Sequence, residues 1–169
     1  MTSSADPAGD GFRRGVRLGV DWGKARVGVA ACDSDGLLAY PVETIAMNDE
    51  ATVFSRLAQL ADEYAAIEVV MGLPLALDGH IRLAATDVMA VARRLGARLD
   101  IPVRLVDERL TTAAANRSIG HLDSRRRRRV VDQAAAAGIL DNALALERNR
   151  GVAPGSLVAD MDCEMKEGS

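Results

Sequence analysis

The sequence predicts an α/β fold: a mixed five-stranded sheet, its first three strands antiparallel, with helices packed on it. The chain has 169 residues, which suits one domain with a sizeable core. Near its start, three short apolar runs are separated only by tight, glycine-containing turns, a pattern typical of antiparallel hairpins. Further on, apolar runs alternate with helical segments, and helical crossovers join parallel strands.

The first three strands form a continuous antiparallel unit. The tripeptide WGK predicts the turn after the first strand, and DSDG predicts the turn after the second. Pro41 has no N–H to give to a sheet, which places part of the third strand at an edge. The predicted strands cover residues 16–21, 26–32 and 37–45.

The rest of the domain alternates between helices and strands. Apolar residues recur at helical spacing in two segments, each followed by a short apolar strand. Thr111 is a plausible N-cap of a short helix, and an Ala-rich helix comes last. The predicted helices cover residues 50–64, 81–99, 111–119 and 129–148, and the predicted strands cover 67–71 and 103–106.

Three regions are expected: a disordered N-terminal arm (1–15), a folded domain (16–150) and a flexible acidic tail (151–169). Cys32 and Cys163 lack zinc-like spacing and support no disulfide framework, which favours a reducing cytoplasm. The first residues do not resemble a signal peptide, and no run approaches the ~18 apolar residues of a membrane span. We therefore expect a cytoplasmic protein without a membrane partner.

The charge of the chain is unevenly distributed. The net charge is -3 overall, but the two ends are acidic, and residues 11–150 carry a net charge of +2. Aromatic residues make up only 3% of the chain, which argues against a platform for stacking bases. Arginine is suited to bidentate phosphate contacts, so a run of five predicts a nucleic-acid backbone site, against the alternative of a solvated helix start. The run is Arg125, Arg126, Arg127, Arg128 and Arg129.

Acidic residues stand near the ends of three predicted elements. Asp21 ends the first strand beside a glycine turn, although a turn-capping role would also explain it. Asp107 and Glu108 follow the fifth strand and should point to opposite faces, so only one can face Asp21; a solvated charged loop is the alternative. Asp132 lies near the start of the last helix, where the helix dipole alone would favour a carboxylate.

Three carboxylates from three elements at one end of the sheet predict a site for Mg²⁺ or Mn²⁺, because these ions prefer oxygen ligands. Two such ions can activate a water and stabilise the leaving oxygen of a phosphodiester. His80 and His121 are isolated in predicted loops and are interpreted as surface residues. The segment from Gly72 to Gly79 is a predicted loop at the end where parallel strands carry function, although a strand-to-helix turn would look the same.

Four segments carry a resemblance to a known family. They are LGVDWGKARVGVA (18–30), VVMGLPLALDG (69–79), VDERLTT (106–112) and VDQAAAAGIL (131–140). Together, and in this order, they resemble the YqgF/RuvX family of Holliday-junction-resolvase-like proteins, whose fold is RNase H-like (RuvC-like). Trp22 is bulkier than expected after the first Asp, and Ala25 stands where Arg is frequent. Neither departure removes a carboxylate.

The resemblance implies roles for particular residues. Asp21, Glu108 and Asp132 would form the acidic catalytic and metal-binding set. In the mechanism that we propose for this set, Asp21 bridges or anchors the metal ions and water attacks in line. Gly23 and Gly72 would shape the cleft. Asp107 could replace Glu108 if the fifth strand ended one residue earlier. The resemblance also implies Arg109 at the substrate. From their charge, we expect Lys24, Arg26 and the five-arginine run to hold the nucleic-acid backbone with it.

The predicted function is a metal-dependent nuclease acting on structured nucleic acid. The resemblance points to maturation of the 5′ end of precursor 16S rRNA, and cleavage of four-way DNA junctions is the alternative. A junction resolvase should act as a symmetric homodimer, and the sequence reveals no dimer face. A further alternative is a nucleic-acid-binding factor without catalysis, for which the acidic residues would be dispensable.

Overall fold

A mixed six-stranded sheet runs through the protein in the order β3-β2-β1-β4-β5-β6. The computed structural model describes residues 12–74, 85–107 and 124–161, and only the backbone of 124–133. β1, β4 and β5 are parallel, and the other three strands pair antiparallel to their neighbours. The strands are β1 (Arg17–Trp22), β2 (Arg26–Cys32), β3 (Ala39–Ala46), β4 (Glu68–Leu73), β5 (Val103–Asp107) and β6 (Ser156–Leu157).

The predicted fold class and antiparallel start are confirmed, and the predicted strand count of five is corrected to six. β3 lies at an edge of the sheet, which is where Pro41 was expected to place it. The sixth strand has two residues, too few to show any alternation of apolar and polar side chains. Sequence periodicity therefore could not reveal it.

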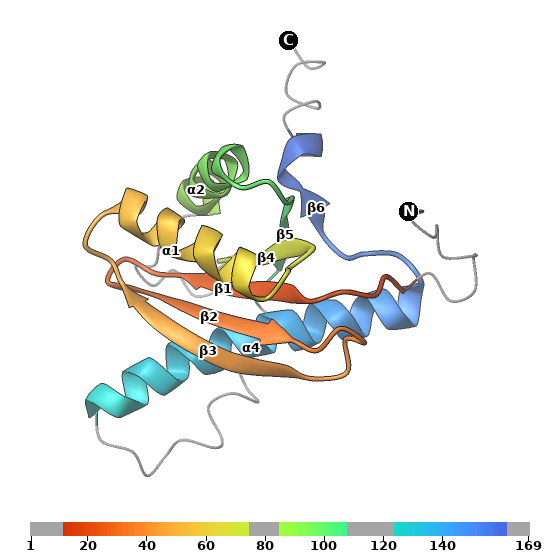
Figure 1. Cartoon of the computed structure of the whole chain (residues 1–169), viewed down its shortest axis with the longest axis horizontal. Coiled ribbons are helices and arrows are strands. Elements are labelled where there is room, and N and C mark those ends of the chain that lie inside the picture. The colour runs from red at the N-terminus through yellow and green to blue at the C-terminus, as the bar shows by residue number, and fades with distance from the viewer. Residues whose placement is uncertain (1–11, 75–84, 108–123, 162–169) are drawn as a thin grey trace.

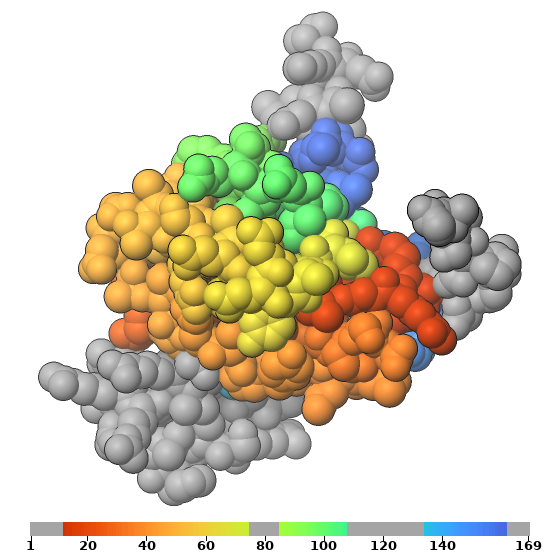
Figure 2. Space-filling view, in the orientation of Figure 1, coloured from red at the N-terminus to blue at the C-terminus, as the bar shows by residue number. Residues whose placement is uncertain are grey.

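The helices form two layers around the sheet. In Figure 1, α1 (Glu50–Glu63) and α2 (Ala85–Arg98) cover one face, and α4 (Ser124–Arg150) crosses the other. Figure 2 views the molecule from the α1–α2 side. α4 begins five residues before the predicted start at 129. The predicted helix at 111–119 lies outside the described residues.

Side-chain alternation along β1 assigns its residues to the two faces. Leu18, Val20 and Trp22 are buried in one apolar cluster with residues of α1 and α2. Arg17 and Gly19, which alternate with them, contact α4. β1 is therefore a central strand with helices on both faces, and the face toward α4 is the one that carries its polar residues.

α4 approaches β1 so closely that only glycine fits between them. A Cβ placed on Gly19 would lie 2.7 Å from the carbonyl oxygen of Ala136 and 3.0 Å from the Cβ of Leu140. Ala136 is itself fully buried. The small residues at 134–137 had predicted such a close approach of the last helix to the sheet, and the contact at Gly19 confirms it.

The folded part is longer at both ends than the predicted range of 16–150. Phe12 is buried in the apolar cluster that includes α4. At the other end, Gly155 has a positive φ of 69° and passes so close to the Leu105 carbonyl oxygen that any Cβ would collide with it. β6 follows directly, and Val158 is buried in the core. Of the predicted acidic tail, only residues 162–169 lie outside the described part of the chain.

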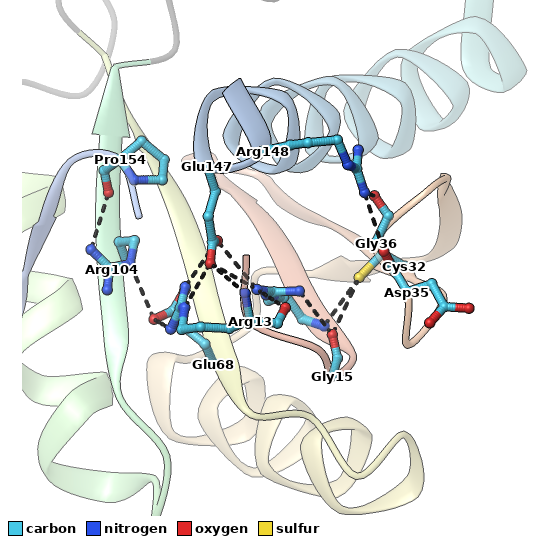
Figure 3. A network of polar contacts seen from close by, with 11 residues as sticks. Arg13, Gly15, Cys32, Asp35, Gly36, Glu68, Arg104, Glu147, Arg148 and Pro154 are labelled. Atoms are coloured by element: carbon cyan, nitrogen blue, oxygen red, sulfur yellow. Dashed lines mark hydrogen bonds and ion pairs between the residues drawn. The ribbon is translucent and has the colours of Figure 1, made fainter. Parts of the chain in front are cut away.

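A buried network of ion pairs joins the N-terminal segment to α4 and to the sheet (Figure 3). Glu147 of α4 accepts hydrogen bonds from Arg13 at 2.8 Å and from Arg17 at 3.2 Å. Glu68 of β4 accepts hydrogen bonds from Arg13 and from Arg104, both at 3.1 Å. Arg104 also donates to the carbonyl oxygen of Pro154, just before β6. The network therefore holds both ends of the described chain against α4 and the sheet.

Replacing Gly19 by alanine should destabilise the fold, because the added methyl group meets backbone that cannot move aside. The expected loss is about 1–3 kcal/mol in the free energy of unfolding measured with urea. Gly96→Ala in α2 is the matched control, since its Cβ would meet only Val103 at 3.8 Å. That control should be neutral or stabilising by about 0.5 kcal/mol. Equal losses for the two variants would contradict a tight contact between α4 and β1.

The Glu147 network should make stability depend on pH. Burial is the largest single effect and raises the pKa of Glu147, but the hydrogen bonds from Arg13 and the charges of Arg13 and Arg17 together outweigh it, so the pKa lies below its ordinary value. The stabilisation is therefore complete above the unfolded-state pKa of about 4.3 and is lost as pH falls through the lower folded-state value. Glu147→Gln should cost about 3 kcal/mol at pH 7, and the cost should shrink at acid pH.

Urea unfolding of wild type and variant between pH 3 and pH 8 measures this effect. Glu63→Gln is the control, because Glu63 is 57% exposed and its 3.5 Å ion pair with Arg56 should be worth little. A Glu147→Gln cost that does not change with pH would contradict the assigned role.

Candidate active site

Asp21 lies next to the end of β1 and is half-buried. Alternation along the strand puts it on the same face as Gly19, toward α4. It pairs with Gly28 on β2, and since Val20 pairs with Met71, it comes level with Gly72 on β4. Both neighbouring strands thus present a glycine beside Asp21, so no side chain flanks the carboxylate in the sheet.

Gly72 lies inside β4 rather than in the loop predicted after that strand. It is buried and pairs with Val106 of β5. Val70 and Val106 both belong to the apolar cluster that includes α4, so Gly72 shares the face of Asp21. Because Gly72 has no side chain, the face of the sheet between Asp21 and β5 is open at this position. The opening agrees with the cleft-shaping role that the resemblance implies for Gly72.

The turn after β1 needs glycine. The Gly23 N–H donates to the Arg26 carbonyl oxygen at 3.0 Å, and a Cβ on Gly23 would lie 2.6 Å from the same oxygen. Lys24 is exposed in this turn, and Arg26 is the half-buried first residue of β2. Arg26 alternates with Val27 and so shares a face with Gly28 and Asp21. The turn thus brings two cations to the end of β1 that carries Asp21.

α4 runs antiparallel to β1. Glu147 contacts Arg17 at the start of β1, and Ala136 contacts Gly19 two residues later. Position 132 is four residues before Ala136, about 6 Å back along the helix. Two residues on from Gly19, about 6.6 Å, is Asp21. The backbone of α4 at position 132 therefore passes the end of β1 where Asp21 lies.

The sequence had suggested that Asp132 lies near the start of its helix, and the structure shows that it does not. α4 begins at Ser124, so position 132 is more than two turns inside it. The helix dipole acts mainly within the first turn, and it does not account for a carboxylate at this position. A favourable interaction with the helix dipole therefore does not explain why an acidic residue stands at position 132.

Asp107 is the last residue of β5 and is half-buried. Val106 belongs to the cluster that faces α4, whereas Leu105 and Val103 belong to the cluster on the α1–α2 side. Alternation places Asp107 with Leu105, on the face opposite Asp21. Asp107 is therefore a poor substitute for Glu108 as the second acid of the site.

Comparison with known proteins places these features in a family. The family model described as "RuvX: Holliday junction resolvase" matches residues 15–146. This chain belongs to the RuvX family. The resemblance carried by the four sequence segments is confirmed.

Curated relatives of this RuvX-family chain cover most of its length. One from Streptomyces avermitilis is 50% identical over 148 residues, spanning 86% of this chain and 95% of the relative. Another from Streptomyces coelicolor is 46% identical over 160 residues, spanning 92% and 96%. Both carry the name "Putative pre-16S rRNA nuclease".

The fold is similar to that of a solved structure. Thermus thermophilus RuvC in complex with a Holliday junction substrate matches with a TM-score of 0.54 and 12% identity. The match covers 83% of this chain and 99% of that one. The RNase H-like, RuvC-like fold class is thereby confirmed.

Several predicted site residues of this RuvX-family chain are not described. Glu108, Arg109, His80 and His121 lie outside the described residues. Asp132 and the five arginines at 125–129 are described as backbone only, within α4. Among the side chains that the structure does describe, no three of His, Cys, Asp or Glu are grouped to hold a metal ion.

Gly28 is the site residue that sequence reasoning missed. The predicted WGK turn would have paired Asp21 with Ala25, and only the observed register, in which Trp22 belongs to β1 and pairs with Val27, brings Gly28 opposite Asp21. None of the helices in the described ranges has the length and apolar character needed to cross a membrane.

Proposed function

We propose that this protein is a metal-dependent nuclease that cleaves precursor 16S rRNA near its 5′ end. The observation that carries the proposal is the setting of Asp21. This carboxylate faces α4 at the end of a central parallel strand, with Gly28 and Gly72 on the strands beside it. The names of the RuvX relatives support the choice of substrate.

Asp21, Glu108 and Asp132 form the proposed catalytic and metal-binding set. Position 108 follows Asp107, and continued alternation would return its side chain to the face of Asp21. Position 132 of α4 passes the same end of β1. Gly72 leaves room between β1 and β5, where side chains from the three elements would converge.

The donor set fits Mg²⁺ or Mn²⁺, because all three proposed ligands are carboxylates. When bound, such ions would supply an activated water and stabilise the leaving oxygen of the phosphodiester. The glycines on either side of Asp21 leave the sheet beside it without side chains, so that a nucleic-acid backbone can come close. Asp21 itself would hold the ions against the sheet.

Basic residues would hold the substrate backbone beside this site. Lys24 and Arg26 lie in or next to the turn that follows Asp21, and Arg109 follows the proposed acid Glu108. The five-arginine run occupies the first turns of α4, and no acidic residue accompanies it there. The helix dipole disfavours cations at that end, so bound phosphate would relieve an unfavourable charge arrangement.

Cleavage of four-way DNA junctions is the second candidate function. It is favoured by the description of the matched family and by the structural likeness to RuvC. It requires a homodimer that cuts symmetrically. The homodimer and the cytoplasmic location stay predictions, and so does the alternative of a factor that binds nucleic acid without cleaving it.

Asp21→Asn should abolish cleavage while leaving the fold intact, because it removes the charge but keeps the shape of the side chain. Cleavage of a precursor 16S 5′ leader with Mg²⁺ or Mn²⁺ should slow at least ~100-fold, which corresponds to about 2.7 kcal/mol of transition-state stabilisation. Asp62→Asn is the matched control, because Asp62 is exposed on α1, on the other side of the sheet. The control should cleave like the wild type.

The same assay, with a synthetic four-way junction as a second substrate, separates the alternatives. A wild type that binds both substrates but cuts neither with any divalent metal would contradict the nuclease proposal. Paired symmetric nicks in the junction, with the RNA leader left intact, would replace the rRNA function by the resolvase function.

A further inference from the structure

A second basic cluster lies at the end of α4 remote from Asp21. It consists of Arg14 from the segment before β1 and of Arg148 and Arg150 from the last turn of α4, and all three are exposed. We call these three residues the far-end cluster. Within the described part of the chain, none of them forms an ion pair with a carboxylate.

The segment before β1 holds Arg14 beside α4. Arg13 is bonded to Glu147 of α4, and the Gly15 N–H donates to the Ser34 carbonyl oxygen in the β2–β3 turn at 2.8 Å. Arg14 is therefore fixed between the end of the helix and that turn. Its backbone position is set, while its side chain stays exposed to solvent.

Arg148 is held in place without losing its charge. Its guanidinium lies over the Phe12 ring, 4.6 Å from the centroid. It also donates to the carbonyl oxygens of Asp35 at 3.2 Å and Gly36 at 2.9 Å. These partners are neutral, so they orient the side chain while a full positive charge stays at the surface.

Nearby acidic groups are mostly engaged elsewhere. Glu147 is occupied by Arg13 and Arg17, and the Asp33 carboxylate accepts three backbone N–H groups of its own turn. Asp35 is exposed, but Figure 3 shows its carboxylate directed away from Arg148. The three positive charges of the far-end cluster are therefore opposed nearby by one free carboxylate, that of Asp35.

The surface of α4 between the two basic ends carries little charge. Its solvent side presents small or neutral residues at 135, 138, 142, 145 and 149. Asp141, beside this strip, uses its carboxylate to accept the Ala39 N–H at 2.9 Å. From position 132 to Arg148 the helix rises about 24 Å, which an A-form RNA duplex covers in about eight or nine base-pair steps.

We propose that the far-end cluster binds the phosphate backbone of a base-paired RNA arm, about 24 Å along α4 from Asp21. The inference rests on the proposed nuclease function and extends it: the preferred substrate would carry a double-stranded arm long enough to reach from the scissile site to Arg148. Complementary charge supports this partner, since a duplex presents phosphates at regular spacing and the cluster presents arginines without ionic partners.

Binding of stem RNAs to the full chain, measured in EDTA, tests this proposal. Two RNAs share the same cleavage region and differ in arm length, with about 5 and about 14 base pairs. The double variant Arg14→Ala/Arg150→Ala should bind the long-armed RNA about 10-fold more weakly than the wild type does. The plot of log affinity against log salt should become shallower, with a slope smaller in magnitude by roughly 2. Both proteins should bind the short-armed RNA equally.

Single variants supply the matched control. Arg150→Ala and Arg98→Ala each remove one exposed positive charge, but Arg98 lies on α2, on the opposite face of the sheet. Only Arg150→Ala should weaken binding of the long arm. Equal losses for both variants, or a double variant that binds the long arm like the wild type, would overturn the proposal. A double variant weakened only on a DNA duplex of the same length would overturn the choice of RNA.

The outcomes also separate this inference from the function on which it rests. If the wild type cleaves the RNA and the double variant binds both arms normally, the inference fails alone. If the wild type cleaves no RNA but the double variant loses affinity only for the long arm, the nuclease function fails and the binding surface is supported.

Discussion

The contact between α4 and β1 at Gly19 is the constraint on which the rest of the structure depends. Because no side chain fits there, α4 lies directly against β1, the strand that joins the antiparallel strands to the parallel ones. That contact fixes which face of the sheet is covered and how far along β1 each turn of α4 falls. The candidate site follows from it, since Asp21 is the next residue of β1 on the covered face.

The C-terminal end of α4 packs the protein together, and its N-terminal end lies at the candidate site. At its C-terminal end, buried ion pairs with Glu147 and Glu68 hold the N-terminal segment and the approach to β6 against the sheet. At the other end, α4 passes the carboxyl edge of the parallel strands, where loops of α/β proteins commonly carry function. Rigid packing at one end thus sets the position of the helix at the other, where the proposed chemistry takes place.

Sequence reasoning predicted the parts of the fold that depend on local patterns. The hairpin of β1 and β2 followed from its turn, the edge position of β3 followed from Pro41, and the close approach of α4 followed from its alanines. Sequence reasoning missed β6 and the packing of Phe12 against α4, because both depend on contacts between segments far apart in the chain. The depth of Asp132 within α4 was missed because five consecutive arginines hid the start of the helix. For the candidate site, the sequence indicated Asp21 beside a glycine turn, and its role there stays a prediction; choosing between Asp107 and Glu108 needed the assignment of faces along β5.

The central claim is that divalent metal binds at Asp21, on the α4 face of the sheet. Titration of ¹⁵N-labelled protein with Mn²⁺ tests it most directly, because the paramagnetic ion broadens the amide signals of nearby residues. Signals of Asp21, Gly28 and Gly72 should broaden first, those of Glu147 and Arg150 at the far end of α4 should persist to higher Mn²⁺ concentration, and Asp21→Asn should remove the effect. Broadening centred elsewhere, or unchanged in Asp21→Asn, would contradict the claim.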